Sequence, residues 1–169
     1  MGFWLPVRDF PGYSVSTEGR IRNDVTNRDL SLSQGNRGVV VVNLHRESRW
    51  HTRAVSILVA QAHCAPPEYY TYNSPIHLDG QRSNLNAYNL AWRPRWFAIK
   101  HNRQFHTPRL LVTKPIILLN TGEVQDQAFP FVLKYGLLER EILMSLGCDD
   151  VVFPGRLDFR FAHKVTINK

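Results

Sequence analysis

Cysteine and acidic residues are scarce in this chain of 169 residues. Cys64 and Cys148 are its two cysteines, and their wide separation without CxxC spacing excludes a zinc finger, a zinc ribbon and a disulfide scaffold. No apolar run approaches the roughly 18 residues of a membrane span, and the N-terminal MGFWLPVRDF lacks the basic-then-apolar order of a signal peptide. The 14 Asp and Glu residues are outnumbered by 21 Lys and Arg, which gives a net charge of +7. The sequence therefore predicts no membrane association and a polyanionic partner, of which nucleic acid is the commonest.

The positive charge lies mainly in the first three quarters of the chain. Residues 1–125 carry the whole net charge, whereas residues 126–169 are neutral overall. Most of the cations are Arg, whose planar fork suits phosphate oxygens and guanine edges. Residues 93–114, which we name the basic strip, contain no acid. The strip is either an ordinary solvated surface or a face for a polyanion, and we favour the second. Candidate nucleic-acid contacts are Arg93, Arg95, Lys100, Arg103, Arg109 and Lys114 in the strip, with Arg20, Arg22, Arg37 and Arg140 outside it.

Hydrophobic periodicity and turn residues predict an α+β fold with small antiparallel sheets. Expected strands lie within residues 4–22, 39–53, 116–119 and 157–161, and expected helices cover 54–63, 95–105, 128–135 and 138–146. Asp79-Gly80 predicts a hairpin turn, and Gly136 separates the last two helices in a helix-turn-helix layout. The expected segments are a β-rich N-terminal module (1–53), a ββα core (54–106), a basic linker (107–115) and a C-terminal helix-turn-helix-like module with flanking strands (116–169).

Three polar residues follow one another at intervals of twelve: His77, Asn89 and His101. A hairpin His, an Asn at a helix start and a polar group on that helix could converge on one point. Inside a basic chain this order resembles the HNH motif of phage and intron homing endonucleases, a ββα-metal fold. The stretches that carry the resemblance are WLPVRDFPGYSVSTEGRIRN (an N-terminal DNA-associated module), ILVAQAH, IHLDGQRSNLNAYNLAW (the motif itself) and ILLNTGEVQDQAFPFVLKYGLLEREILMSLG (a C-terminal helix-turn-helix module).

The resemblance implies a phosphodiesterase in which His77 is the general base and Asn89 orients it by a hydrogen bond. It also implies one divalent metal, held by the residue before the base and by a residue of the next helix. Those positions are Ile76 and Ala98 here, and neither side chain can ligate a metal. His101 and Asp79 are the candidate substitute ligands, although His101 could equally be part of a basic face. The expected cofactor is Mg²⁺ or Mn²⁺ if the protein is active, and none otherwise.

Two functions remain open from the sequence. The first is a double-strand DNA-binding protein of HNH descent that nicks or cleaves DNA. The second is an inactive relative that binds nucleic acid as a regulator or as a subunit of a larger nucleoprotein complex. RNA or a ribonucleoprotein is an alternative partner, and the C-terminal module, whose second helix carries Glu139 and Glu141 beside Arg140, offers a surface for a protein partner. We expect a phage or a mobile element to encode the protein. The expected location is the cytoplasm of the host cell or its nucleoid.

Overall fold

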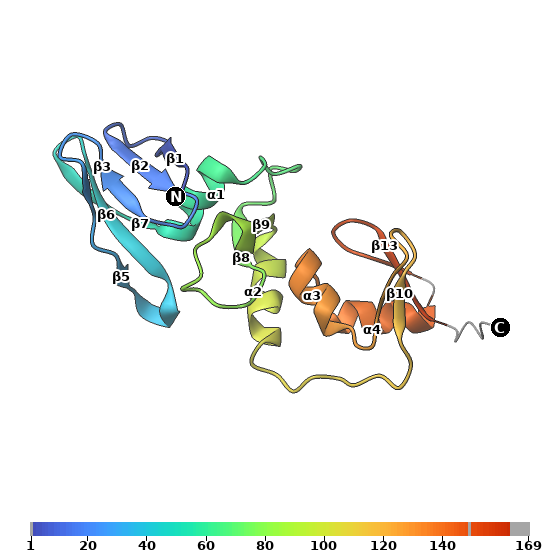
Figure 1. The fold of residues 1–169 in the computed structure, drawn as a ribbon. Coiled ribbons are helices and arrows are strands. Elements are labelled where there is room, and N and C mark those ends of the chain that lie inside the picture. Colours follow the sequence, from blue (N-terminus) through green and yellow to red (C-terminus); the bar gives the residue numbers. More distant parts are fainter. Residues whose placement is uncertain (1, 149, 163–169) are drawn as a thin grey trace. The chain divides into compact units, whose positions relative to one another are not determined.

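The computed structural model describes residues 2–148 and 150–162 of the chain (Figure 1). It has the expected α+β composition, with small sheets in which all paired strands are antiparallel. The chain forms two compact units, residues 1–99 and 100–169, and the division falls within one helix. Within the described residues, no helix combines the length and the apolar character that crossing a membrane requires.

The first unit begins with a four-stranded sheet in the order β1-β2-β3-β4. Its strands are β1 (Trp4–Pro6), β2 (Tyr13–Ser16), β3 (Ile21–Asn23) and β4 (Arg28–Asp29). Val15 and Ile21 are buried while Ser14 and Arg22 are more exposed, which is the period of two that the sequence showed. The expected strands within residues 4–22 are therefore present.

The second sheet contains the long hairpin of the first unit. It is formed by β5 (Ser33–Gln34), β6 (Val40–Arg46) and β7 (Arg49–Ala54), and helix α1 (Val55–His63) follows directly. Arg46 pairs with Arg49, and the two turn residues, Glu47 and Ser48, both have positive φ, as a tight hairpin turn with the right twist requires. This hairpin and α1 match the elements predicted from the β-branched run and the apolar stretch before Pro66.

The N-terminal sheets and the ββα region share one hydrophobic core. Buried residues from Val7 to Leu90 form a single cluster. Ala87 donates a backbone hydrogen bond to Thr17 (2.8 Å), and Gly19, with a φ of 84°, lies so close to Leu85 that a side chain there would collide with it. Residues 1–53 and 54–99 are thus packed as one body rather than as two separately folded modules.

The ββα region consists of β8 (Ser74–His77), β9 (Leu90–Arg93) and α2 (Arg95–Gln104). His77 pairs with Leu90, so residues 78–89 form a loop that ends in the short 3-10 helix η2 (Ala87–Asn89). Asp79-Gly80 does make a turn, with a hydrogen bond from the Gly80 N–H to the His77 carbonyl, but the two strands are not joined by a tight hairpin. Asn89 precedes β9 and does not begin a helix, which corrects the sequence expectation.

The second unit contains another four-stranded sheet, in the order β11-β10-β13-β12, with two helices. Its strands are β10 (Ile116–Leu118), β11 (Glu123–Gln125), β12 (Val151–Val152) and β13 (Leu157–Phe161), and its helices are α3 (Phe129–Tyr135) and α4 (Glu139–Cys148). Gly136 ends α3 with a φ of 62°, a left-handed value that glycine adopts without strain. The two helices and the closing strand were predicted, whereas the two-residue β12 carried too little pattern to be seen.

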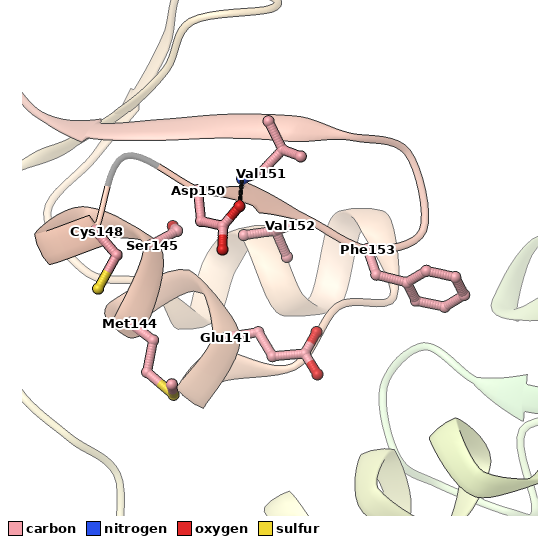
Figure 2. Close-up of a pocket in the computed structure, with 8 residues that line it drawn as sticks. All are labelled: Glu141, Met144, Ser145, Cys148, Asp150, Val151, Val152 and Phe153. Atoms are coloured by element: carbon pink, nitrogen blue, oxygen red, sulfur yellow. Dashed lines mark hydrogen bonds between the residues drawn. The ribbon is translucent and has the colours of Figure 1, made fainter.

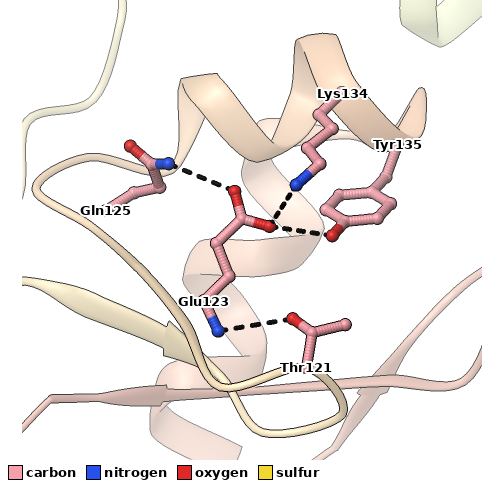
Figure 3. A network of polar contacts seen from close by, with 5 residues as sticks. All are labelled: Thr121, Glu123, Gln125, Lys134 and Tyr135. Atoms are coloured by element: carbon pink, nitrogen blue, oxygen red, sulfur yellow. Dashed lines mark hydrogen bonds and ion pairs between the residues drawn. The ribbon is translucent and has the colours of Figure 1, made fainter.

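Polar side chains hold this second unit together. Glu123 accepts hydrogen bonds from Lys134 (2.6 Å) and Tyr135 (2.8 Å) of α3 and from Gln125 (3.2 Å), which ties β11 to that helix (Figure 3). The Gln127 side chain forms hydrogen bonds with both the N–H and the carbonyl of Val112. Residues 107–115 are therefore attached to this unit and do not form a free linker. The expected C-terminal module ends in residues 163–169, which lie outside the described part of the chain.

Candidate functional site

His77 stands at the end of β8, where the strand enters the loop 78–89. Its side chain is 8% exposed, and its Nε2 atom is buried without a hydrogen-bond partner among the described residues. Burial lowers the pKa of His77; the Asp79 carboxylate opposes this effect, and the Arg82 guanidinium adds to it. The imidazole is therefore neutral at neutral pH, which is the state in which it can accept a proton.

Asn89 fixes the loop that follows His77. Its Oδ1 accepts from the Asp79 N–H (3.1 Å), and its Nδ2 donates to Asp79 Oδ1 (2.9 Å) and to the Asn84 carbonyl (2.9 Å). The Leu78 N–H also donates to the Asn89 carbonyl (2.8 Å). The side-chain bonds thus go to the loop and not to the His77 ring, so Asn89 fixes the backbone after His77, which differs from the hydrogen bond that the resemblance implied.

Asp79 is the acceptor at the centre of this network. Its carboxylate receives the Gln81 N–H (2.8 Å), the Asn84 amide (2.7 Å) and the Asn89 amide (2.9 Å). Burial acts to raise the pKa of Asp79, but these hydrogen bonds and the nearby His77 bring that pKa below its usual value. The ionised Asp79 carboxylate therefore holds the loop 78–89 together through these hydrogen bonds. Asn86 caps η2, because its side chain accepts a hydrogen bond from the Tyr88 N–H.

Comparison with known proteins supports the resemblance in two ways. A protein-family model, the NUMOD4 motif, which is found in homing endonucleases, matches residues 3–45. A solved structure that describes DNA binding and cleavage by the HNH homing endonuclease I-HmuI aligns with a TM-score of 0.55 and 19% identity, and the alignment covers 95% of this chain and 98% of that one. The fold is that of an HNH endonuclease. A search of curated proteins finds no match.

The two positions that the resemblance assigned to metal ligands carry apolar side chains. Ile76 is 1% exposed and belongs to the buried interior, and Ala98 is buried on α2. The remaining acid, Asp79, accepts three hydrogen bonds through its two carboxylate oxygens. Within residues 2–148 and 150–162, no three His, Cys, Asp or Glu side chains are grouped as a metal site would require.

His101, the other suggested ligand, is fully buried in α2. Its ring packs edge-on against Phe105, with the ring centroids 5.1 Å apart. Because the residue is fully buried, the alternative that it belongs to a basic surface is wrong.

The α2 helix exposes its cations and buries part of its apolar residues. Arg95, Lys100 and Arg103 are exposed, whereas Phe97 and Ala98 are buried, as expected when one side of a helix faces the protein interior. Trp96 and Ile99 are also exposed, so the outer face of α2 combines cations with apolar surface. Three further predicted contacts are exposed in the second unit: Arg109, Lys114 and Arg140.

The other predicted arginines are more involved in the fold. Arg22 and Arg20 lie over the Trp4 ring, with guanidinium carbons 4.2 and 5.2 Å from its centroid, and Arg20 also lies 3.5 Å from the Asp29 carboxylate. Burial lowers the pKa of Arg93, which donates to the Trp92 carbonyl at 2.8 Å. Arg93 is therefore mainly a structural residue, whereas the outer atoms of Arg20 are open to solvent.

One arginine near His77 was not predicted. Arg82 donates from Nη1 to the Arg37 carbonyl, which brings the loop 78–89 against the turn at residues 36–38. In the sequence Arg82 is a single cation in an asparagine-rich stretch, so no charge pattern marks it.

The second unit has a pocket of about 300 Å³ between α4 and β12 (Figure 2). Its lining includes the carboxylates of Glu141 and Asp150 and the apolar side chains of Met144, Val151 and Phe153, and no Lys or Arg is among the described residues that line it. Burial raises the pKa of Glu141, and the Lys100 charge opposes that change. Because its charge is negative, this pocket is not suited to a polyanion.

Proposed function

We propose that this protein binds double-stranded DNA on an HNH-type scaffold. The observation that carries the proposal is the solvent exposure of the acid-free basic strip, in which five cations are accessible: Arg95, Lys100, Arg103, Arg109 and Lys114. Cations that neutralise phosphates release condensed counterions, and this release supplies most of the affinity of a DNA-binding protein. The likeness in fold to a DNA-binding homing endonuclease supports the same partner.

The salt dependence of duplex binding tests the proposal. We expect retention of duplex DNA at ~50 mM salt and a slope of log affinity on log salt of roughly −4 to −7, at about −0.9 per phosphate contact. The double variant Arg95→Gln/Arg103→Gln should reduce the magnitude of the slope, whereas Arg156→Gln, an exposed arginine of the second unit, should not. A flat salt response, or tighter binding to RNA than to a duplex of equal length, would contradict double-stranded DNA as the partner.

A second candidate function, nicking of the DNA backbone, is favoured by His77. A neutral, desolvated imidazole with an unsatisfied ring nitrogen is suited to take the proton of a water molecule that attacks phosphorus. The side chains present do not complete a metal clamp, so we favour DNA binding without efficient cleavage, in a regulator or in a subunit of a nucleoprotein complex. The acidic pocket beside α4 is then available to a protein partner.

Nicking of supercoiled plasmid separates the two candidates. The assay compares Mg²⁺, Mn²⁺ and chelator, with His77→Ala as the test variant and His45→Ala, an exposed histidine of β6, as the matched control. We expect no metal-stimulated nicking above the level of His77→Ala. Efficient nicking by the unaltered protein that only His77→Ala abolishes would make the protein an active endonuclease.

A further inference from the structure

The pocket between α4 and β12 combines negative charge with apolar surface (Figure 2). Its volume of about 300 Å³ is at the lower end of the range for binding pockets, and it can take a few side chains of a partner. Glu141 and Asp150 supply the carboxylates, and the Val151 N–H donates to Asp150 Oδ1 at 3.2 Å. Met144 and Val151 are 59% and 46% exposed, so the apolar part of the lining is open to solvent. A complementary partner is therefore both basic and apolar.

Residues 107–115 of the same unit have this complementary composition. The sequence of this segment, TPRLLVTKP, contains two cations, Arg109 and Lys114, and no acid. Leu110 and Leu111 lie between the two cations and are 57% and 82% exposed. Contiguous exposed apolar surface with a polar rim is typical of a surface that binds another protein.

The 107–115 segment is held in a fixed position although it contains no helix or strand. The Gln127 side chain forms hydrogen bonds with the N–H and the carbonyl of Val112, both at 3.1 Å. The guanidinium carbon of Arg109 lies 3.0 Å from the centroid of the Phe129 ring. A segment that is already ordered loses less conformational entropy when it binds, which favours association.

Within one copy of the chain, the segment does not occupy the pocket. None of residues 107–115 is among the described residues that line it, and neither are Gln127 and Phe129, which hold the segment. Each copy therefore carries two complementary surfaces, one acidic and apolar and one basic and apolar, that do not meet each other.

We propose that the pocket between α4 and β12 of one copy binds the 107–115 segment of a second copy. Arg109 and Lys114 then face the pocket carboxylates, and the exposed leucines cover its apolar lining. Complementary charge of this kind selects the partner and sets the register of the contact. The proposal goes beyond DNA binding and does not depend on it.

Such a contact joins two different surfaces of identical chains. One segment in one pocket buries less than the roughly 1,200 Å² of a stable interface, so the association is weak and requires a high protein concentration. Arg109 and Lys114 also belong to the basic strip, so bound DNA and the pocket of another copy would compete for the same two cations.

Sedimentation of the full chain over a range of concentrations tests the proposal. We expect the mean mass to rise with concentration, with a dissociation constant of about 0.1–1 mM. Asp150→Lys reverses a charge of the pocket and Lys114→Glu a charge of the segment, and each should weaken self-association by roughly tenfold. The matched controls are Asp126→Lys and Arg8→Glu, which reverse exposed charges outside both surfaces and should leave self-association unchanged.

Mixing the two reversed variants is the decisive measurement. Asp150→Lys retains an unaltered segment and Lys114→Glu an unaltered pocket, so an equimolar mixture should associate more tightly than either variant alone. Variants that had simply failed to fold would not recover on mixing. Leu111→Ser, at a position that is 82% exposed, should weaken self-association while the melting temperature stays unchanged.

Three results would overturn the proposal. A protein that stays monomeric at ~1 mM shows that a second copy is not the occupant, and the pocket is then left to a different protein. If the unaltered protein associates but Asp150→Lys and Lys114→Glu associate equally well, or the controls lose as much, the contact uses other surfaces. If the mixture associates no better than the separate variants, the pocket and the segment do not bind each other.

Discussion

Replacement of Asn89 by Ala tests whether the loop 78–89 is fixed in the way that the structure indicates. The substitution removes three side-chain hydrogen bonds, one of them to the ionised Asp79 carboxylate. A neutral hydrogen bond contributes about 1 kcal/mol net and one to a charged group about 1.5–3 kcal/mol. Because Asn89 is only half-buried, water can replace part of the loss, and we expect a destabilisation of about 2–4 kcal/mol. For a unit of this size that corresponds to a fall of roughly 10–20 °C in melting temperature.

Intrinsic tryptophan fluorescence isolates the relevant unit. All four tryptophans, Trp4, Trp50, Trp92 and Trp96, lie in residues 1–99, so their emission reports mainly on the first unit. Asn86→Ala is the control from the same loop, since it removes one hydrogen bond from an asparagine side chain of similar exposure. We expect that control to cost about 1 kcal/mol or less.

Equal stabilities of the Asn89→Ala and Asn86→Ala proteins would refute the conclusion that the side chain of Asn89 fixes the loop 78–89. So would a stable Asn89→Ala protein in which the His77 ring resonances are unchanged, because His77 is positioned through the backbone that Asn89 holds. Denaturation should be followed with urea as well as heat, since a change in the slope with urea would reveal a loss of cooperativity rather than of stability.

Three further predictions follow from the same unit. Ile76→Asp, the change that would restore a metal ligand at the HNH position, should lower the free energy of unfolding by about 3–5 kcal/mol, because it places a carboxylate in a fully buried position. If tryptophan fluorescence shows an undiminished stability of this variant, position 76 is accessible to water. Gly19→Ala should lower the free energy of unfolding by about 2–4 kcal/mol, because the new methyl group collides with Leu85 and because residue 19 has a positive φ. An unchanged stability in urea unfolding would contradict this packing. The folded pKa of His77 lies below its unfolded value, so its contribution to stability is present above about pH 6.5 and is lost as the pH falls through the folded pKa; stability measured between pH 7 and 5 should decline less in His77→Gln.

Local sequence patterns were sufficient for most of the secondary structure. The β-branched run at residues 39–42 and the apolar stretch 54–63 predicted a hairpin and a helix, and both are present, as β6 with β7 and as α1. The spacing of His77 and Asn89 predicted an HNH-like site; the fold comparison supports an HNH-type fold, and the roles of the two residues stay predictions. These features are readable because periodicity and turn chemistry depend on neighbouring residues alone.

Burial decided which candidate residues are available for chemistry. Ile76 and His101 both lie in the interior. Nothing in the sequence around His101 distinguishes a buried histidine from an exposed one. The charge of the basic strip was evident from composition, but only the tertiary packing separates exposed Arg95 on α2 from half-buried Arg93 at the end of β9. Exposure depends on which elements cover a residue, and these elements come from distant parts of the chain.

The sequence by itself determined the α+β elements, the basic character and the pair His77 and Asn89. Only the tertiary structure decided that Asn89 bonds to Asp79 instead of the His77 ring and that Arg82 meets Arg37. The physical reason is the range of the interactions. A strand or helix is specified by side chains two to four positions apart, whereas a polar side chain chooses among all donors and acceptors that folding brings within hydrogen-bond distance, including one that lies 45 positions away in the sequence.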